Sequence, residues 1–275
     1  MDLKTLQDLA PWDWPAGTDK MLLALLRDER TSESDLRLAV ACAGEFTVID
    51  GELVAALLHL LRNGDTAEEV RGGAAIALGP VLEYADSEGF ADPADRPIRK
   101  RTFDELQQSL RRLYADATVP RGVRRRILEA SVRAAQDWHA GAVRAAYASD
   151  DEAWRLTAVF CMRFVRGFDE QVLAALDSEN PEIRCQAVTA AGVWGLQAAW
   201  PRVAALVASA ATDKTLRLAA IDAAASIRPH DAAELLDSLV DSDDEDIAAA
   251  VEEALAMVSG LSGLDDDLDD DDELR

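Results

Sequence analysis

The feature that most constrains the fold of this chain is a dipeptide that recurs about every thirty residues, an apolar residue followed by arginine. The successive second positions are separated by 34, 53, 31, 29, 33 and 31 residues, so one insertion interrupts a regular spacing. The seventh occurrence, Ile247-Ala248, has lost the arginine. The arginines in this position are Arg37, Arg71, Arg124, Arg155, Arg184 and Arg217. A fixed period of this length is typical of solenoids built from stacked repeats.

The residues that follow each dipeptide share one face of a helix. When the apolar residue is position zero, positions +4, +7, +8 and +11 lie on the same side of an α-helix. From Ile183, these positions hold the apolar residues Ala187, Ala190, Ala191 and Trp194. Across the seven occurrences, the residues that depart from the apolar pattern are Gly44, Thr47 and Ser131. The pattern therefore predicts seven helices, each with an apolar stripe along one side.

A second apolar stretch follows the patterned helices, for example Leu53, Leu57 and Leu60 after the first. Asp and Ser clusters precede the next patterned helix, where such residues act as N-caps. The repeating unit is therefore a helical hairpin, and a single hairpin of this size cannot bury its own stripe. Stability must come from stacking neighbours into a continuous core. We predict an all-α chain, a right-handed α-solenoid of about seven helical hairpins.

Four segments carry a resemblance to a known family: "DLRLAVACAG", "EVRGGAAIALG", "EIRCQAVTAAG" and "TLRLAAIDAAA". They resemble HEAT repeats, particularly the bacterial form first noted in phycobilisome lyases, and the resemblance covers about residues 33 to 260. In that family the arginine tends to pair with an acidic residue of the preceding turn and so forms a ladder between units. The resemblance therefore implies a structural role for the six arginines. The candidate acidic partners are Asp35, Asp65, Asp151, Glu182 and Asp213.

Three segments follow from these patterns. Residues 1–32 contain a short apolar helix and are expected to cap the exposed stripe of the first repeat, as solenoids require. In this segment Trp12 and Trp14 either pack on their own end or bind a partner. Residues 33–262 form the solenoid, with an insertion loop at about 86–101 that contains glycine and proline. Residues 263–275, "GLDDDLDDDDELR", have too little apolar content to fold and are expected to be a disordered acidic tail.

Charge is distributed unevenly along the chain. The net charge of −24 argues against a general phosphate binder and favours a neutral or basic partner. Residues 96–133 nevertheless contain 11 basic against 4 acidic residues. The candidate partner-binding residues in this segment are Arg99, Lys100, Arg101, Arg111, Arg112, Arg125 and Arg126. Three other interpretations remain open: a solvated helix surface that balances acidic neighbours, a nucleic-acid or damaged-base site, and a contact with the acidic tail.

The sequence contains no recognisable catalytic constellation. His59, His139 and His230 are far apart, and none is followed by the glutamate that HEAT-like iron hydroxylases use to bind their metal. Neither a nucleophile elbow nor a glycine-rich phosphate loop is present. We therefore expect no catalytic residues, no cofactor and no metal site. The alternative is a HEAT-like lyase or glycosylase, because both activities occur on such scaffolds.

Cysteine usage and hydropathy bear on location. The three cysteines form no CxxC pair, which fits a reducing cytoplasm, and no apolar run is long enough to cross a membrane. The resulting hypothesis is a cytoplasmic, monomeric, non-catalytic protein–protein interaction scaffold. We expect its partner, another protein, to bind on the concave solenoid surface, which we expect the second helices of the hairpins to line.

Overall fold

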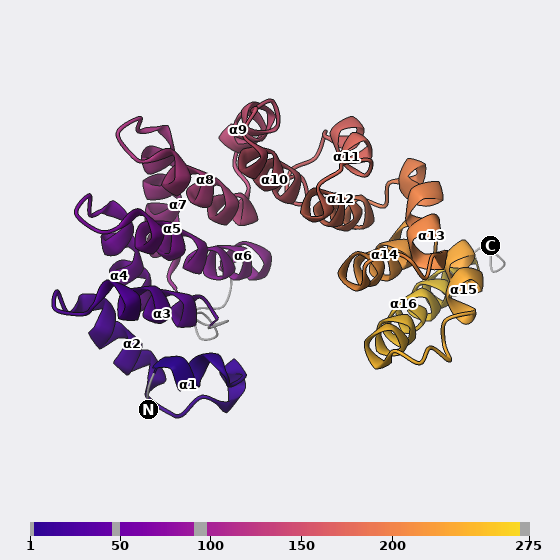
Figure 1. The fold of residues 1–275 in the computed structure, drawn as a ribbon, viewed down its shortest axis with the longest axis horizontal. Helices are drawn as coiled ribbons and strands as arrows, with labels where there is room; N and C mark the ends of the chain where they lie inside the picture. The colour runs from indigo at the N-terminus through magenta and orange to yellow at the C-terminus, as the bar shows by residue number, and fades with distance from the viewer. Residues whose placement is uncertain (1–2, 46–49, 91–97, 270–275) are drawn as a thin grey trace, which may run out of the picture. The chain divides into compact units, whose positions relative to one another are not determined.

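The structure, a computed structural model, describes residues 3–45, 50–90 and 98–269, with side chains described up to residue 259. Every regular element within these residues is a helix, which confirms the predicted all-α class. The chain divides into two compact units, Met1–Ala142 and Val143–Arg275, called unit 1 and unit 2 below (Figure 1).

Most helices fall into the predicted repeats, but α6 was not predicted: the helix that begins at Val70 was expected to continue through Val81, whereas α5 ends at Ala77 and a separate helix runs to Glu88. The elements of unit 1 are α1 (Leu3–Gln7), η1 (Pro11–Asp13), α2 (Thr18–Arg27), α3 (Glu33–Gly44), α4 (Gly51–Arg62), α5 (Glu68–Ala77), α6 (Gly79–Glu88), α7 (Lys100–Ala115), α8 (Arg121–Ser131), η2 (Val132–Ala134) and the start of α9 (Asp137–Tyr147). The further elements of unit 2 are α10 (Glu152–Cys161), α11 (Asp169–Ala175), α12 (Pro181–Val193), η3 (Gln197–Ala199), α13 (Trp200–Ala208), α14 (Lys214–Ile227), α15 (Pro229–Asp237) and α16 (Glu245–Asp269).

The helices that begin with the repeating dipeptide, here called first helices, are α3, α5, α8, α10, α12, α14 and α16. The second helices are α4, α7, α9, α11, α13 and α15, and none follows α16 among the described residues. Within unit 1, α5 packs between α3 and α8, whereas in unit 2 the helices from α10 through α12 and α14 to α16 contact in sequence. The first helices therefore form one layer in each unit, as a solenoid requires.

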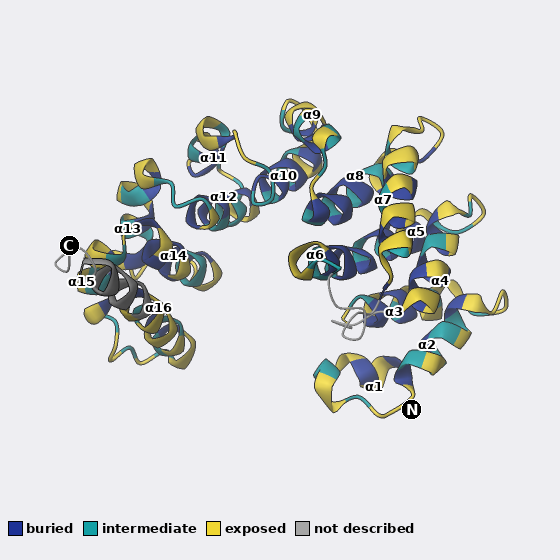
Figure 2. Ribbon diagram, turned by 180° about the vertical axis from the view of Figure 1, so that it is seen from behind, coloured by how far each residue is buried: buried dark blue, intermediate teal, exposed yellow. Residues whose placement is uncertain are grey.

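Several second helices pack against the first helix of the next repeat. Helix α4 packs against α5, α7 packs against α8, and the same arrangement joins α11 to α12 and α13 to α14. Buried residues lie along the first helices, as Figure 2 shows for α5, α8, α12 and α14. The core of each unit is therefore continuous from repeat to repeat and does not close within a single hairpin.

The predicted apolar stripes face this core. Ile183, Leu216 and Ile247 are only 5%, 4% and 6% exposed, and none of the described stripe positions is exposed. Thr47, which departs from the pattern, lies outside the described residues. The stripes are therefore confirmed, because the helical period alone places these positions on one side.

Side-chain caps define where several first helices begin. The Asp213 carboxylate accepts hydrogen bonds from the backbone N–H groups of Thr215 at 3.0 Å and Leu216 at 3.4 Å. Asn180 accepts equivalent bonds at the start of α12, and Ser32 accepts one at the start of α3. These bonds satisfy N–H groups that have no partner inside the helix, and each contributes about 1 kcal/mol. The polar clusters between repeats thus act as the predicted caps.

The N-terminal segment packs on the first repeat. Helix α1 contacts α3, α2 contacts α3 and α4, and Leu6 and Leu22 are fully buried. The indole Nε1 of Trp14 donates to the Leu6 carbonyl at 2.9 Å, so Trp14 packs on its own end. Trp12 differs from it, because 85% of its surface is exposed.

Two predicted segments lie partly outside the described residues. Helix α6 ends at Glu88 and α7 begins at Lys100, so the ends of the expected insertion loop are visible, but residues 91–97 are not described. Helix α16 extends to Asp269, past residue 263, the predicted start of the acidic tail. Residues 270–275 lie outside the described chain.

Candidate functional site

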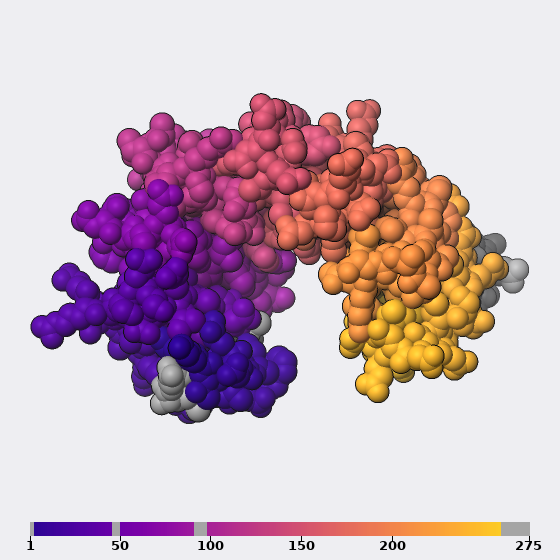
Figure 3. All heavy atoms as spheres, viewed as in Figure 1, coloured from indigo at the N-terminus to yellow at the C-terminus, as the bar shows by residue number. Residues whose placement is uncertain are grey.

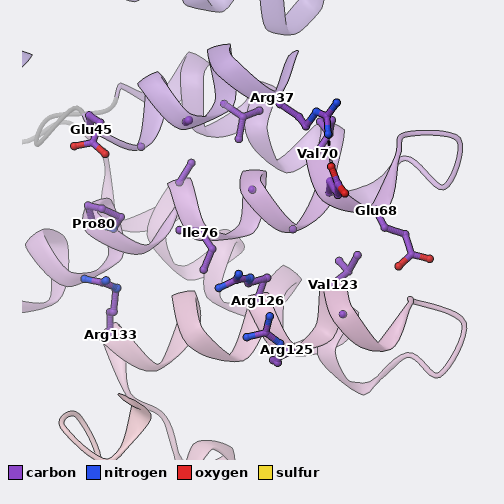
Figure 4. A pocket seen from close by; sticks show the side chains of 18 residues that line it. Arg37, Glu45, Glu68, Val70, Ile76, Pro80, Val123, Arg125, Arg126 and Arg133 are labelled. Carbon is purple, nitrogen blue, oxygen red and sulfur yellow. Dashed lines mark hydrogen bonds and ion pairs between the residues drawn. The ribbon is translucent and has the colours of Figure 1, made fainter. Parts of the chain in front are cut away.

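A groove of about 860 Å³ opens on the first-helix layer of unit 1. It is formed by α3, α5, α6, α8 and η2, and its lining combines small and apolar residues with four arginines and three glutamates, Glu45, Glu68 and Glu69 (Figure 4). These arginines are Arg37, Arg125, Arg126 and Arg133. Within each unit, side chains fill much of the space that the ribbons leave between neighbouring helices, as the space-filling view of Figure 3 shows.

Glycines on α5 and α6 make room for the arginine side chains that cross them. A Cβ atom at Gly72 would lie 3.3 Å from Cγ of Arg126, and one at Gly79 would lie 2.9 Å from Cδ of Arg133. Larger residues at these glycines would push both arginine side chains away from the helix. The glycines of "VRGGAAIALGP" therefore position the guanidinium groups of α8 and η2 along one wall of the groove.

Ion pairs orient the four arginines. Arg37 pairs with Glu69 of the next repeat, and Arg133 pairs with Glu83 of α6. Arg126 Nη1 lies 2.9 Å from an oxygen of Glu129, and Arg125 Nη1 lies 3.8 Å from the same oxygen. Such partly exposed pairs add little to stability, but they hold long side chains in place. Arg125 and Arg126 therefore lie beside the same Glu129 carboxylate, which brings two guanidinium groups together on the α8 wall.

The N-terminus of α8 adds a partial positive charge beside these arginines. Its first turn contains no acidic residue and its N-cap, Pro120, offers no side-chain cap, whereas α3, α5, α10, α12 and α16 all carry acidic residues there. The N-terminal end of a helix has a partial positive charge, so arginines at that end are unfavourable for the helix itself.

The predicted partner-binding residues do not all line this groove. Arg125 and Arg126 belong to its lining, but none of the five on or before α7 does. Three of the five interact within their own helix: Lys100 with Asp104 at 2.7 Å, Arg101 with Glu105 at 2.8 Å, and Arg112 with the Gln108 side chain. Arg99 and Arg111 are exposed. The α7 part of the basic segment therefore matches the interpretation of a solvated helix surface.

Two groove residues were not anticipated as binding residues. Arg37 is predicted as a ladder residue only, and Arg133 is not singled out by the sequence. The sequence feature that could have indicated them is the group of glycines on α5 and α6, because glycine often marks a place where another group approaches the backbone closely. These glycines identify the arginines only when the helix that packs against them is known, and the sequence does not show which helix that is.

The ladder arginines join consecutive repeats through backbone carbonyls. Arg71 Nε donates to the Leu61 carbonyl at 3.0 Å, and Arg217 Nε donates to the Val207 carbonyl at 2.9 Å. Both acceptors lie in the last turn of the preceding second helix, where carbonyls lack an intrahelical partner and the helix dipole is negative. The partner of these arginines is therefore a helix end, in contrast to the acidic residue that the resemblance implies.

The other ladder arginines are more varied. Arg155 Nη1 lies 3.5 Å from the Ser149 carbonyl, just beyond the end of α9. Arg37 has carboxylate partners, Glu69 and, at 3.8 Å, Glu33. For Arg124 and Arg184 the Nε atom is buried and has no hydrogen-bond partner within the described residues.

His139 has a structural environment. It is 1% exposed, its ring stacks on Trp138 at 3.8 Å between centroids, and its Nδ1 accepts a hydrogen bond from the Gln136 backbone at 2.8 Å. Nε2 therefore carries the proton and donates to the Ser131 hydroxyl at 3.0 Å. Burial, aided by the nearby charge of Arg111, lowers the pKa of His139 to about 4, although the Gln136 carbonyl, 3.3 Å from Nδ1, opposes this shift because it favours the protonated ring. The ring is therefore neutral at pH 7.

Among the residues that the structure describes, no group of three or more His, Cys, Asp and Glu side chains is arranged to hold a metal ion. No helix in the described part of the chain is both long enough and apolar enough to span a bilayer.

Comparisons with known proteins bear on the family. Residues 170–256 match the model of the HEAT repeats family. No curated protein matches the chain. Among solved structures, human deoxyhypusine hydroxylase in complex with glycerol is 18% identical, over 94% of this chain and 88% of that chain, with a TM-score of 0.42. An engineered protein is also 18% identical, over 90% of this chain and 98% of that chain, with a TM-score of 0.35. Neither likeness is close enough to indicate a function.

The family match covers the segment from α11 into α16, where the dipeptides of α12 and α14 and their buried stripes recur with the predicted spacing. The resemblance of the sequence to HEAT repeats is therefore confirmed, and residues 170–256 of this chain are HEAT repeats.

Proposed function

We propose that this chain is a non-catalytic protein-binding scaffold and that the groove of unit 1 receives the partner. The observation that carries the proposal is an open groove in which four arginines are held beside apolar side chains by glycines and ion pairs. Repeat proteins commonly bind their partners on such extended, preformed surfaces. The HEAT repeats of the chain support the same class of function.

The lining indicates the chemistry of the partner segment. Guanidinium groups bind carboxylates with two parallel hydrogen bonds, and the neighbouring Ile76 and Pro80 offer apolar contact. A segment with acidic residues between apolar ones fits this lining. The net charge favours a neutral or basic partner, but charges are screened beyond about 8 Å at physiological salt, so the groups inside the groove dominate recognition.

The position of the groove differs from the expected binding face. We expected the second helices to line the partner surface, but the groove that the structure describes lies on the first-helix face of unit 1. Ala41 of α3 lines the groove and is exposed, and Ala55 of α4, on a second helix, is also exposed. These two alanines provide a matched pair of probe positions.

The experiment places a photo-crosslinking amino acid at Ala41 or at Ala55 of the full chain, in cells of the native host. We expect protein adducts from position 41 that are weaker or missing at position 55, identified by mass spectrometry. Adducts only from position 55 would assign binding to the second-helix face. The same adducts from both positions would indicate nonspecific capture and contradict the proposal.

The alternative function is nucleic-acid or damaged-base binding by the basic segment 96–133. Two of its basic residues, Lys100 and Arg101, are paired within their own helix, which reduces their availability for phosphates. Fluorescence anisotropy with a labelled DNA duplex at 50 and 200 mM salt measures this activity. Tight binding that weakens steeply with salt, together with no protein adduct at position 41, would favour the alternative.

The proposal includes a cytoplasmic, monomeric protein. Cys42 and Cys161 are buried, as expected for small apolar core residues in a reducing compartment. Light scattering of the purified chain measures the oligomeric state directly.

A further inference from the structure

We propose that the turn between α4 and α5 is a site of spontaneous covalent modification, at which Asn63 loses its side-chain nitrogen as ammonia and becomes aspartate or isoaspartate. Asn63 is the C-cap of α4, and it forms the only Asn-Gly pair of the sequence with Gly64. The sequence contains one other asparagine, Asn180, which precedes Pro181. The two asparagines therefore provide a reactive position and an internal control.

The reaction requires only Asn63, the peptide that follows it and water. The backbone nitrogen of Gly64 loses its proton and attacks Cγ of Asn63, so that a bond between these two atoms forms and the bond from Cγ to Nδ2 breaks. The proton reaches the departing ammonia through the solvent, and a cyclic succinimide remains. Water then opens the ring. Hydrolysis at the side-chain carbonyl leaves aspartate, whereas hydrolysis at the main-chain carbonyl leaves isoaspartate, in which the backbone passes through the side chain.

The Gly64 nitrogen is available for this attack. Gly64 is exposed, and its N–H donates no hydrogen bond to the residues that the structure describes. A Cβ atom at Gly64 would meet nothing within 4 Å, so neighbouring groups leave space around this residue. A backbone N–H inside a helix is held by its carbonyl partner, whereas one that faces water can lose its proton to hydroxide.

The side chain of Asn63 is held beside the following backbone. Its Oδ1 accepts a hydrogen bond from the Asp65 backbone N–H at 3.0 Å, which forms an Asx turn. This bond stabilises the negative charge that develops on Oδ1 during the attack, as an oxyanion-hole donor does. The Nδ2 group, which must leave, donates no hydrogen bond within the described part of the chain.

Asn180 forms the same kind of turn but lacks the nucleophile. Its Oδ1 accepts hydrogen bonds from the backbone N–H groups of Glu182 at 2.8 Å and Ile183 at 3.3 Å. The next residue is Pro181, whose nitrogen has no proton to lose. The side-chain carbonyl is therefore hydrogen-bonded at both asparagines, and the two sites differ in the nitrogen that follows.

The modification places a negative charge at an unfavourable point of the fold. The C-terminal end of α4 is the negative end of its dipole, and Asp65 and Glu68 already lie in the turn and at the start of α5. The Leu61 carbonyl, two residues before Asn63, accepts the hydrogen bond of Arg71. Isoaspartate also lengthens the main chain beside this bond. Because α5 lines the groove of unit 1, modified chains should have a loosened junction next to that surface.

Incubation of the purified full chain at pH 7 and at pH 9, followed by peptide mapping with mass spectrometry, tests the inference. We expect the modified fraction at Asn63 to grow with time and to be severalfold larger at pH 9, because hydroxide removes the Gly64 amide proton. Asn180 should remain unmodified at both pH values. In water enriched in heavy oxygen, the label should enter residue 63, and fragmentation by electron transfer should find isoaspartate as well as aspartate there.

Two substitutions of Gly64 make the test specific. Gly64→Pro removes the N–H and should abolish the modification, whereas Gly64→Ala keeps the N–H but hinders ring closure and should slow the modification severalfold. Gly64 does not have a positive φ, so alanine is compatible with its backbone even if proline prevents folding. Gly141→Ala is the matched control, because it also adds a methyl group where nothing lies within 4 Å, and it should leave the rate unchanged. Thermal unfolding of each variant verifies that it is folded.

Three results would overturn the inference. The first is an Asn63 that stays intact at pH 9 in the folded chain, and the second is equal modification of Asn180. The third is aspartate without isoaspartate at residue 63, formed at the same rate in the wild type and in Gly64→Ala, because this would indicate direct hydrolysis of the side-chain amide. The proposed function is tested separately by the protein adducts from position 41, so either proposal can fail without the other.

Discussion

At the scale of single residues, polar side chains serve mainly to connect repeats. Arg71 is buried, and the hydrogen bond from its Nε to the Leu61 carbonyl joins the start of one first helix to the end of the preceding second helix. The positive charge also lies at the negative end of a helix dipole, which compensates for burial of the guanidinium group. Arg37, Arg124, Arg155 and Arg184 do not make the same hydrogen bond to a helix end, so the six arginines are not equivalent.

His139 makes stability depend on pH. Its pKa is about 4 in the folded chain, mainly because burial disfavours the charged ring, and its ordinary value is 6.5. The unfolded chain therefore binds a proton between pH 6.5 and pH 4 that the folded chain does not. We expect the free energy of unfolding to be unaffected above pH 6.5 and to fall by up to about 3 kcal/mol as the pH approaches 4.

Urea unfolding of the wild type and of His139→Gln across this pH range checks the prediction. The variant should show a shallower loss of stability between pH 6.5 and 4, although it is less stable at pH 7. Parallel curves for the two proteins would mean that His139 titrates normally.

At the scale of helices, small residues determine how closely the first helices approach. A Cβ atom at Gly192 of α12 would lie 2.8 Å from Cα of Ala223 in α14, and one at Gly44 would lie 3.1 Å from Cα of Ala77. In both cases the nearest atom is backbone, which cannot move without shifting the whole helix. Alanines in the stripes, such as Ala187 and Ala220, are fully buried at the same interfaces.

This contact yields a matched pair of substitutions. Gly192→Ala should destabilise the protein by about 1 to 3 kcal/mol, because the added methyl group overpacks the contact between α12 and α14. Gly141→Ala in α9 meets nothing within 4 Å and should stabilise the protein by about 0.5 to 1 kcal/mol, because alanine favours the helix. Urea unfolding measures both effects. Equal changes for the two variants would show that helix propensity, not packing, governs Gly192.

At the scale of the whole molecule, stability comes from contacts between neighbouring repeats within each of two compact units. A defect in one interface should therefore act locally. In Gly192→Ala we expect faster amide hydrogen exchange in α12 and α14 and unchanged exchange in α3 and α5, as measured by mass spectrometry. A uniform increase along the chain would instead show that the two units unfold as one.

The sequence by itself determined the repeated helices other than α6, their caps and their buried stripes, because these depend on local patterns that repeat with the helical period. It also identified the HEAT repeats that the family match confirms. The acceptors of Arg71 and Arg217 escaped prediction for a physical reason: every residue has the same backbone carbonyl, so a carbonyl acceptor leaves no mark in the sequence.

The groove was decided by tertiary structure alone. Its pairs join residues far apart in the chain, such as Arg37 with Glu69 and Arg133 with Glu83. Which side chains meet depends on the offset between stacked first helices, and a change of one helical turn would bring different residues together. The arginines of α8 were visible as a charged run, but only the packing of α8 against α5 separates those that line the groove from those on α7.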